Sequence, residues 1–150
     1  MVREMRVGDE AQLLQLGQIM HQESAYFSKY RVNIDKWKKM CIAALTKPTI
    51  ACFVYEKDDS IIGMWAGYIS SLWYSDDLKV YDTVLFVHPH HRKGPAAYRL
   101  IKASEEWAKL CGAKSTTISL SSGIDTESVS CFLSRLDYST TAVIMEKEIG

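Results

Sequence analysis

Apolar and polar positions recur along this chain with two different periods. Apolar residues return every three to four positions after Asp9 and again after Asn33, which is the spacing of amphipathic helices. Runs of β-branched and aromatic residues follow, and they are separated by turn-forming stretches such as Lys57–Ser60, as is typical of strands. The helical period then returns twice, so helices and strands are interspersed along the chain.

Caps and helix breakers set the bounds of these elements. Asp9, Asn33 and Asp125 are expected to cap helices by accepting hydrogen bonds from free N–H groups of the first turn. The predicted order is β-α-α-β-β-β-α-β-α-β, which is an α/β fold with a mixed central sheet flanked by helices, in one domain over residues 1–150. The predicted elements are strand 2–7, a helix between Asp9 and a loop at 23–30, a helix between Asn33 and Pro48, strands 49–56, 61–72 and 80–87, helix 95–110, strand 116–120, a helix from Asp125 to about 136, and strand 138–148.

Composition excludes several classes of protein. Eighteen basic residues balance eighteen acidic ones, which argues against a protein that binds nucleic acid through phosphate charge. No apolar run is long enough for a membrane span or a signal peptide, so neither a membrane nor a secretory pathway is implied. The four cysteines form no CxxC pair and are expected to be small buried apolar residues. We therefore expect a soluble, cytoplasmic protein.

The segment from Val84 to Ala97 carries the most chemical information. A buried strand leads into a basic turn, His90–Gly94, and then into a helix. A helix start offers unpaired N–H groups and a positive dipole end, so this arrangement predicts an anion site. The alternative interpretation is an ordinary turn with a solvated basic tip. The spacing fits neither a P-loop nor a GxGxxG motif.

This segment resembles the acetyl-CoA signature of the GNAT N-acetyltransferases, V-x-P-x-x-R/Q-x-x-G/A-x-G/A, and the order of elements is that of the GNAT fold. The resemblance implies acetyl-CoA as cosubstrate and no metal. It implies that backbone groups of the strand bind the pantetheine arm and that the turn and helix start hold the pyrophosphate. The residues that it assigns to the cosubstrate are Leu85, Phe86, Val87, Arg92, Lys93, Gly94, Pro95, Ala96 and Ala97.

Three further stretches resemble small phage- and prophage-type members of this family, which would place the protein in the host cytoplasm if it is phage-encoded. They are 21–24, 63–68 with 73–77, and 99–103 with 107–108. Two positions depart from the family pattern. Pro95 has no N–H to donate to a phosphate. Leu133 stands where the family usually has the tyrosine that protonates the leaving thiolate, and Asp137 replaces a glycine.

Asp82, His21 and Glu23 are the candidates for acid–base or substrate-binding work. A carboxylate in a strand that is otherwise apolar through Val87 is costly unless it is paired, so Asp82 is either a base or substrate-ammonium partner, or a structural hydrogen-bonding group. His21 and Glu23 end the first helix beside the loop that walls the acceptor cleft in this fold, with a plain surface helix end as the alternative. The cluster His88–His91 has no carboxylate or cysteine partner nearby and does not predict a metal site.

Aromatic residues at Trp65, Tyr68, Trp73 and Tyr74 are expected to form core and cleft wall, and Gly63 and Gly67 to mark bulges or close approaches. Two functions remain in view. The first is a transferase that moves an acetyl group from acetyl-CoA to a primary amine of a small molecule or protein by direct attack. The alternative is a GNAT-fold binding protein that acts through protein contacts. The acceptor and the oligomeric state stay open, although homodimers are common in this family.

Overall fold

Five strands form one mixed sheet in the computed structural model, which describes all 150 residues. They stand in the order β1-β2-β3-β4-β5, and neighbours are antiparallel except for β4 and β5, which are parallel. This confirms the α/β class with a mixed sheet. The strands are β1 Val2–Glu4, β2 Ile50–Lys57, β3 Ser60–Leu72, β4 Ser75–Val87 and β5 Ser115–Thr116.

Four α-helices and two short 3-10 helices connect the strands. Asn33 caps its helix as expected, because its side chain accepts from the N–H of Lys36. The caps predicted at Asp9 and Asp125 are wrong, since neither side chain bonds to its helix. The helices are α1 Glu10–Glu23, η1 Phe27–Lys29, α2 Ile34–Thr46, η2 Pro89–His91, α3 Ala96–Leu110 and α4 Thr126–Ser134.

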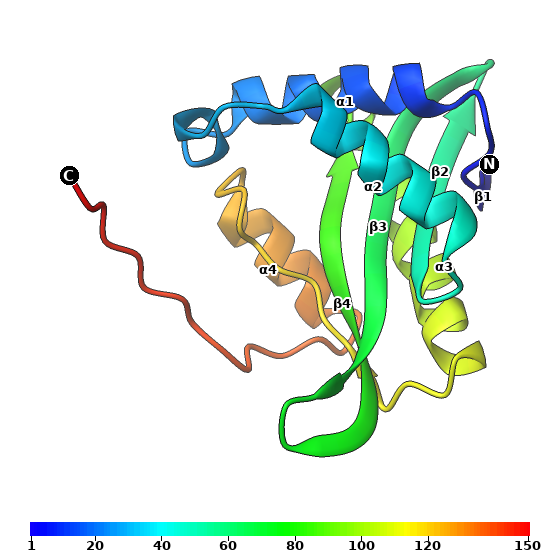
Figure 1. Cartoon of the computed structure of the whole chain (residues 1–150). Helices are drawn as coiled ribbons and strands as arrows, with labels where there is room; N and C mark the ends of the chain where they lie inside the picture. Colours follow the sequence, from blue (N-terminus) through cyan, green and yellow to red (C-terminus); the bar gives the residue numbers. More distant parts are fainter.

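The sheet is covered on both faces (Figure 1). Alternate residues of β2 point to opposite sides: Cys52 and Val54 pack with α1 and α2, whereas Phe53 and Tyr55 pack on the side of α3. Apolar residues of each helix complete the two cores, with Leu13 and Leu16 of α1 in one and Leu100 and Ala108 of α3 in the other. The core fixes the position of β4 from both faces. The functional segment therefore begins on a rigid strand.

A cluster of charges joins β1, α1 and β2 and explains the failed cap. Asp9 accepts two hydrogen bonds from the Arg3 guanidinium, at 2.7 and 3.0 Å, and one from the Arg6 N–H at 2.8 Å. Arg3 also donates to Glu56 of β2 at 2.9 Å. The hydrogen bond from Arg3 is the main cause of a lowered pKa at Asp9. The carboxylate thus bonds to the strand layer instead of its own helix.

Replacing Asp9 with Asn is expected to lower the free energy of unfolding at pH 7 by about 2 kcal/mol, the scale of hydrogen bonds to charged groups. Because the pKa of Asp9 is lowered in the folded protein, its contribution is present above the unfolded value and is lost as pH falls through the folded value. Urea unfolding of wild type and Asp9→Asn between pH 7 and pH 2 should show that the difference in their free energies of unfolding becomes smaller as the pH falls. Asp76→Asn, at an exposed carboxylate, is the matched control and should have little effect. An equal deficit at all pH values would contradict the assignment.

A bulge bends β4 at the position where it leaves β5. Asp82 pairs with Gly67 of β3 and Val84 pairs with Ala66, so Thr83 is the extra residue. A Cβ on Gly67 would come within 2.6 Å of the Tyr81 carbonyl oxygen and of the Trp65 ring. The expectation of a close approach at this glycine is therefore confirmed, and only glycine fits there.

The hairpin between β3 and β4 is longer than predicted. β4 begins at Ser75 rather than at residue 80, and the hairpin projects beyond the rest of the sheet (Figure 1). Trp73 is 94% exposed and Tyr74 is 69% exposed at its tip, so the placement of these two aromatic rings in core or cleft wall is wrong. Trp65, by contrast, is fully buried.

The strand predicted at 138–148 is absent, and β5 ends at Thr116 instead of Leu120. The turn that follows α4 contains a left-handed residue, Asp137 with φ 65°. The Asp137 N–H donates to the Ser134 carbonyl, and the Tyr138 N–H donates to the Leu133 carbonyl. Asp137 thus adopts the conformation that glycine usually supplies at this point. After it the chain extends without helix or strand (Figure 1), and Glu146 and Glu148 near its end accept hydrogen bonds from the segment that follows α1. Cys131 of α4 is exposed, contrary to expectation.

Candidate functional site

β4 and β5 are joined only at one end, and the rest of β4 has an open edge. The ladder between them contains the pairs Lys79–Ser115 and Val80–Thr116. Two further bonds run from the Lys114 N–H to the Leu78 carbonyl at 2.8 Å and from the Thr117 N–H to the Val80 carbonyl at 3.0 Å. From Val84 to Val87, β4 pairs with β3 alone. Backbone groups along this edge are consequently free for a ligand that lies between β4 and the segment after β5.

Asp82 lies at the point where the two strands part. Its carboxylate accepts from the N–H of Ser119 at 2.9 Å and from the hydroxyl of Ser119 at 3.1 Å. This side chain therefore bridges the strands where backbone hydrogen bonds stop. Desolvation raises the pKa of Asp82 above its usual value, and the two bonds from Ser119 oppose that shift. Asp82 is half-buried, so a group held here can be both a structural bridge and a proton acceptor.

The turn after β4 ends in a helix start with unpaired N–H groups. The backbone N–H groups of Lys93, Ala96 and Ala97 have no acceptor in the protein, and Lys93 is exposed beside them. Gly94 differs from expectation, because its N–H donates to the His91 carbonyl at 3.2 Å. Pro95 occupies the N-cap position of α3 and supplies no donor. The dipole of α3 adds positive potential at this point.

Arg92 is held by two groups of the protein. Its Nε donates to the Val87 carbonyl at 3.0 Å, and its two terminal nitrogens bind the Glu23 carboxylate at 2.5 and 2.7 Å. The guanidinium also lies 5.2 Å from the centre of the Phe86 ring. Arg92 thus holds the turn against β4 and α1. The same contacts occupy the Val87 carbonyl and one carboxylate of α1.

His21 and Glu23 both lie at the end of α1, and each contacts a different segment. Glu23 reaches the turn through Arg92, whereas the Nε2 atom of His21 lies 2.6 Å from the Tyr30 carbonyl oxygen of the following loop. A hollow of about 240 Å³ between α1, α2 and this loop includes His21, Tyr30 and Trp37 in its lining. No hydrogen bond joins Asp82 to either residue: its carboxylate bonds to Ser119, and Glu23 reaches β4 at Val87, five positions further along the strand, through Arg92.

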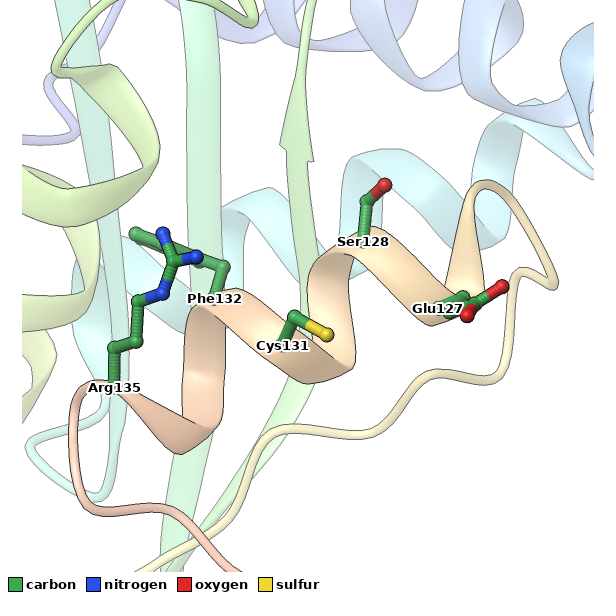
Figure 2. A pocket seen from close by; sticks show the side chains of 5 residues that line it. All are labelled: Glu127, Ser128, Cys131, Phe132 and Arg135. Carbon is green, nitrogen blue, oxygen red and sulfur yellow. The ribbon is translucent and has the colours of Figure 1, made fainter.

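α4 lies beside β4 in the view of Figure 1. Leu133 is its one buried residue, with 5% exposure, and carries no group that could donate a proton. A surface hollow of about 390 Å³ runs along α4, and Figure 2 shows Phe132 and Arg135 extending to the same side of the helix there. All the residues that line this hollow come from α4, so it does not include the open strand edge. Its lining residues are Glu127, Ser128, Cys131, Phe132 and Arg135.

Sequence reasoning missed two partners in this region. Ser119 bonds to Asp82, and Glu105 of α3 accepts a hydrogen bond from the Tyr138 hydroxyl at 3.2 Å after the end of α4. The first depends on the register of a parallel pair, and the second joins residues that are 33 positions apart. No local pattern signals either contact. The structure contains no group of three or more His, Cys, Asp or Glu side chains arranged to hold a metal ion.

Similarity to solved structures agrees with this fold. An aminoglycoside acetyltransferase from an uncultured soil metagenomic sample, in complex with trehalose, superposes with a TM-score of 0.75 at 16% identity, over 100% of this chain and 96% of the other. AAC(6')-Iy in complex with the bisubstrate analogue CoA-S-monomethyl-acetylneamine gives 0.74 at 19% identity, over 100% and 98%. Glucosamine-6-phosphate N-acetyltransferase from Arabidopsis thaliana gives 0.75 at 11% identity, over 100% and 98%. No curated protein matches the sequence.

None of the helices has the length and hydropathy that a membrane span requires. The model of the acetyltransferase (GNAT) family matches residues 13–136, from the first turn of α1 to just past the end of α4. This match includes the open edge of β4, the turn after it and the start of α3. Because it extends over most of the 150 residues, the chain belongs to the acetyltransferase (GNAT) family.

Proposed function

We propose that this protein transfers an acetyl group from acetyl-CoA to a primary amine of a small molecule or a protein. The observation that carries the proposal is the open edge of β4, which leads directly into a helix start with unpaired N–H groups. A free strand edge can pair with the amide groups of a pantetheine arm, and a helix N-terminus attracts the phosphates beyond it. Membership of the GNAT family supports the same cosubstrate.

The binding of acetyl-CoA is divided between the strand and the turn. The N–H and carbonyl of Leu85 and the N–H of Val87 face the open edge of β4 and are offered to the pantetheine arm, whereas the backbone groups of Phe86 face its pair Met64 on β3. The N–H groups of Lys93, Ala96 and Ala97 donate to the pyrophosphate, and the ammonium of Lys93 adds a positive charge. Small residues at this helix start let a phosphate approach the backbone. These groups act without a metal ion.

Arg92 and the Val87 carbonyl contribute indirectly to the same site. The guanidinium of Arg92 is bound to the Val87 carbonyl and to Glu23, so it keeps the turn in the shape that leaves the neighbouring N–H groups free. Gly94 leaves room for the phosphates, and Pro95 presets the direction of α3 without donating. In this proposal Arg92 is a positioning residue.

In the proposed reaction the nitrogen lone pair of the amine attacks the thioester carbonyl carbon. The C–N bond forms, the C–S bond breaks, the nitrogen loses a proton and the departing sulfur gains one. The amine must be neutral to attack, so a base has to take a proton from its ammonium form near pH 7. Asp82 is the proposed base or ammonium partner, since its carboxylate lies where β4 and β5 part and burial raises its pKa.

His21 and Glu23 are proposed to shape the acceptor side of the site. Both carry contacts that hold a segment in place, His21 to the loop at Tyr30 and Glu23 to the turn at Arg92. Either contact would orient the wall against which an amine binds. A role in proton transfer requires these contacts to open when substrate binds. The amine and the loop would then compete for the same atoms.

Two finer assignments belong to the same proposal. Resemblance of residues 21–24, 63–77 and 99–108 to small phage- and prophage-type members supports a phage-type origin. Free thiols at Cys111 and Cys131, neither of them buried, suit the reducing cytoplasm in which acetyl-CoA would be used. The location is tested by fractionation of cells that express the native sequence.

A GNAT-fold binding protein without catalysis is the second candidate, and Leu133 favours it. The side chain at this position is buried and apolar, so it cannot protonate the leaving sulfur. A thiol with a pKa of roughly 8.5 leaves as a tolerable anion, however, and water can protonate it. Loss of the tyrosine therefore slows an enzyme more than it silences one. For this reason we place the transferase first.

Release of free thiol from acetyl-CoA, measured with a panel of amines, tests the two candidates. The panel contains an aminoglycoside, an amino sugar phosphate and a lysine peptide, so that small and macromolecular acceptors are both represented. Acceptor-dependent thiol release supports the transferase. The variant Leu133→Tyr places a hydroxyl at the position where the family usually has a tyrosine, and it is assayed beside wild type. If acetyl-CoA raises the melting temperature of both proteins and neither releases thiol with any amine, the binding protein is the correct assignment.

A further inference from the structure

The hollow of about 240 Å³ between α1, α2 and the loop that joins them, called here the α1–α2 hollow, is lined by none of the residues proposed to bind acetyl-CoA. Gly17 and His21 line it from α1, where they are one helical turn apart. Glu23, which bonds to Arg92 of the turn before α3, is two positions on from His21 and therefore about 200° around the helix. The hollow and the proposed cosubstrate turn thus lie on opposite sides of α1.

Aromatic rings form much of the lining of the α1–α2 hollow. Phe27, Tyr30 and Trp37 all contribute to it. The Trp37 ring lies directly against α1, because a Cβ on Gly17 would overlap it. Tyr30 is 55% exposed and Val32 is 43% exposed, so apolar surface of the hollow is left in water. Apolar surface gathered in a concave site, with a few polar groups beside it, is typical of a small-molecule site.

The charge beside these rings is positive. Arg31 lines the hollow, is exposed and forms no salt bridge, so its guanidinium is free to bind a ligand. No aspartate or glutamate lines the hollow, and Glu146, which accepts from the Tyr30 hydroxyl at 2.8 Å, is not part of the lining. The Nε2 atom of His21 is already engaged at the Tyr30 carbonyl. Arg31 is therefore the group that selects the charge of a ligand.

We propose that the α1–α2 hollow binds a small aromatic carboxylic acid. Its ring lies among Phe27, Tyr30 and Trp37, and its carboxylate accepts two parallel hydrogen bonds from the Arg31 guanidinium. A benzene ring fits a cavity of about 150 Å³, so the hollow holds one ring with a short acidic side chain. An amine would meet a positive charge and no carboxylate, and a neutral ring would leave Arg31 unpaired. The carboxylate is the group that satisfies both the charge and the apolar lining.

Amide NMR spectra of the full-length protein, titrated with phenylacetate, test this site without any turnover. The amide signals of Gly17 and Val32 should move in a saturable way, with a Kd of about 1 mM or lower for a ligand of roughly ten heavy atoms. The signal of Lys93, on the other side of α1, should stay in place. Signals of Gly17 and Val32 that do not respond at ten times this concentration would overturn the proposal.

Two compounds with the same ring test the chemical class. Benzyl alcohol is neutral and 2-phenylethylamine is cationic, and each should bind at least ~10-fold more weakly than phenylacetate, because neither pairs with a guanidinium. Equal binding of the three compounds would show an unselective apolar surface and would overturn the assignment to a carboxylate. Preference for the amine would overturn it as well.

Arg31→Gln should weaken the binding of phenylacetate by ~10-fold, the scale for loss of hydrogen bonds to a charged group. Arg31 is exposed and holds no other residue, so the variant should fold as wild type does. Arg135→Gln, at an exposed arginine of α4, is the matched control and should bind as wild type does. Unchanged affinity in Arg31→Gln would contradict the role of the guanidinium and with it the proposal.

A second titration with phenylacetate, at saturating acetyl-CoA, tests whether the two sites are separate. The Kd for phenylacetate should be the same with and without acetyl-CoA, since α1 lies between the hollow and the turn before α3. Displacement of phenylacetate by acetyl-CoA would place the hollow within the cosubstrate site and would overturn the proposal. Because the first titration contains no acetyl-CoA, its result does not depend on the proposed transferase activity.

Discussion

Gly94→Glu is expected to abolish the rise in melting temperature that acetyl-CoA causes. Gly94 lies in the turn directly before α3, beside the unpaired N–H groups of Lys93, Ala96 and Ala97. A glutamate there carries negative charge to the positive end of the helix and competes with the phosphates for the same donors. At a ligand concentration of ~100 Kd, wild type should gain roughly 5–10 °C for a domain of this size. The variant should gain none.

The structure also supplies the control for this experiment. Gly94 does not have a positive φ, and a Cβ built on it meets only the His91 carbonyl oxygen at 3.4 Å. Both Gly94→Glu and Gly94→Ala should therefore fold with nearly the stability of wild type. Gly94→Ala should retain the shift, because it adds a methyl group and no charge. A shift that persists in Gly94→Glu would place the cosubstrate elsewhere.

Asp82→Asn should lower turnover with an amine by roughly 10²-fold, the usual contribution of a positioned base. The asparagine oxygen can still accept from the Ser119 N–H, so the join between β4 and β5 is kept while the proton acceptor is lost. Binding of acetyl-CoA, followed by the thermal shift, should change little. Unchanged turnover together with an unchanged pH profile would remove Asp82 from the mechanism.

The pH dependence gives an independent readout of the same residue. Because the pKa of Asp82 is raised, the rate should increase with pH through a value above that of an ordinary aspartate, as the carboxylate forms. Ser119→Ala removes a hydroxyl that stabilises the ionised form of Asp82. The rising limb of the pH–rate profile should therefore move to higher pH. A structural role alone would affect stability and leave this limb in place. Turnover measured from about pH 4, near the ordinary value for an aspartate, to pH 9 distinguishes the two.

Local patterns along the chain were sufficient to predict most of the fold. Helical spacing and the Asn33 cap predicted α2, and runs of β-branched and aromatic residues predicted β2 and β3. The signature from Val87 to Ala97 predicted the strand, turn and helix that the structure contains. These features depend on residues close in sequence. Their physical causes, side-chain period and capping, act over a few positions.

Contacts between distant segments decided the rest. Asp9 has the sequence of a helix cap, yet the guanidinium of Arg3 binds it more strongly than its own helix does. Arg92 and Glu23 are 69 positions apart, and their pairing determines which groups of the turn remain free. The bridge from Asp82 to Ser119 depends on the short register between β4 and β5. No local pattern contains this information.

The C-terminal tail, residues Ser139–Gly150, marks the limit of the sequence most clearly. Its threonines and the apolar run Ala142–Met145 determine that the segment suits a strand, because those properties belong to the residues themselves. A strand forms only where a neighbour offers backbone partners, however, and the tail leaves Asp137 in a direction that takes it away from its own sheet. Sequence by itself thus determined the elements, the family signature and the capacity of the tail to pair. Tertiary structure alone decided which edges are filled, which charges are paired and which groups stay open, because each depends on the register and direction of segments that are far apart in the chain.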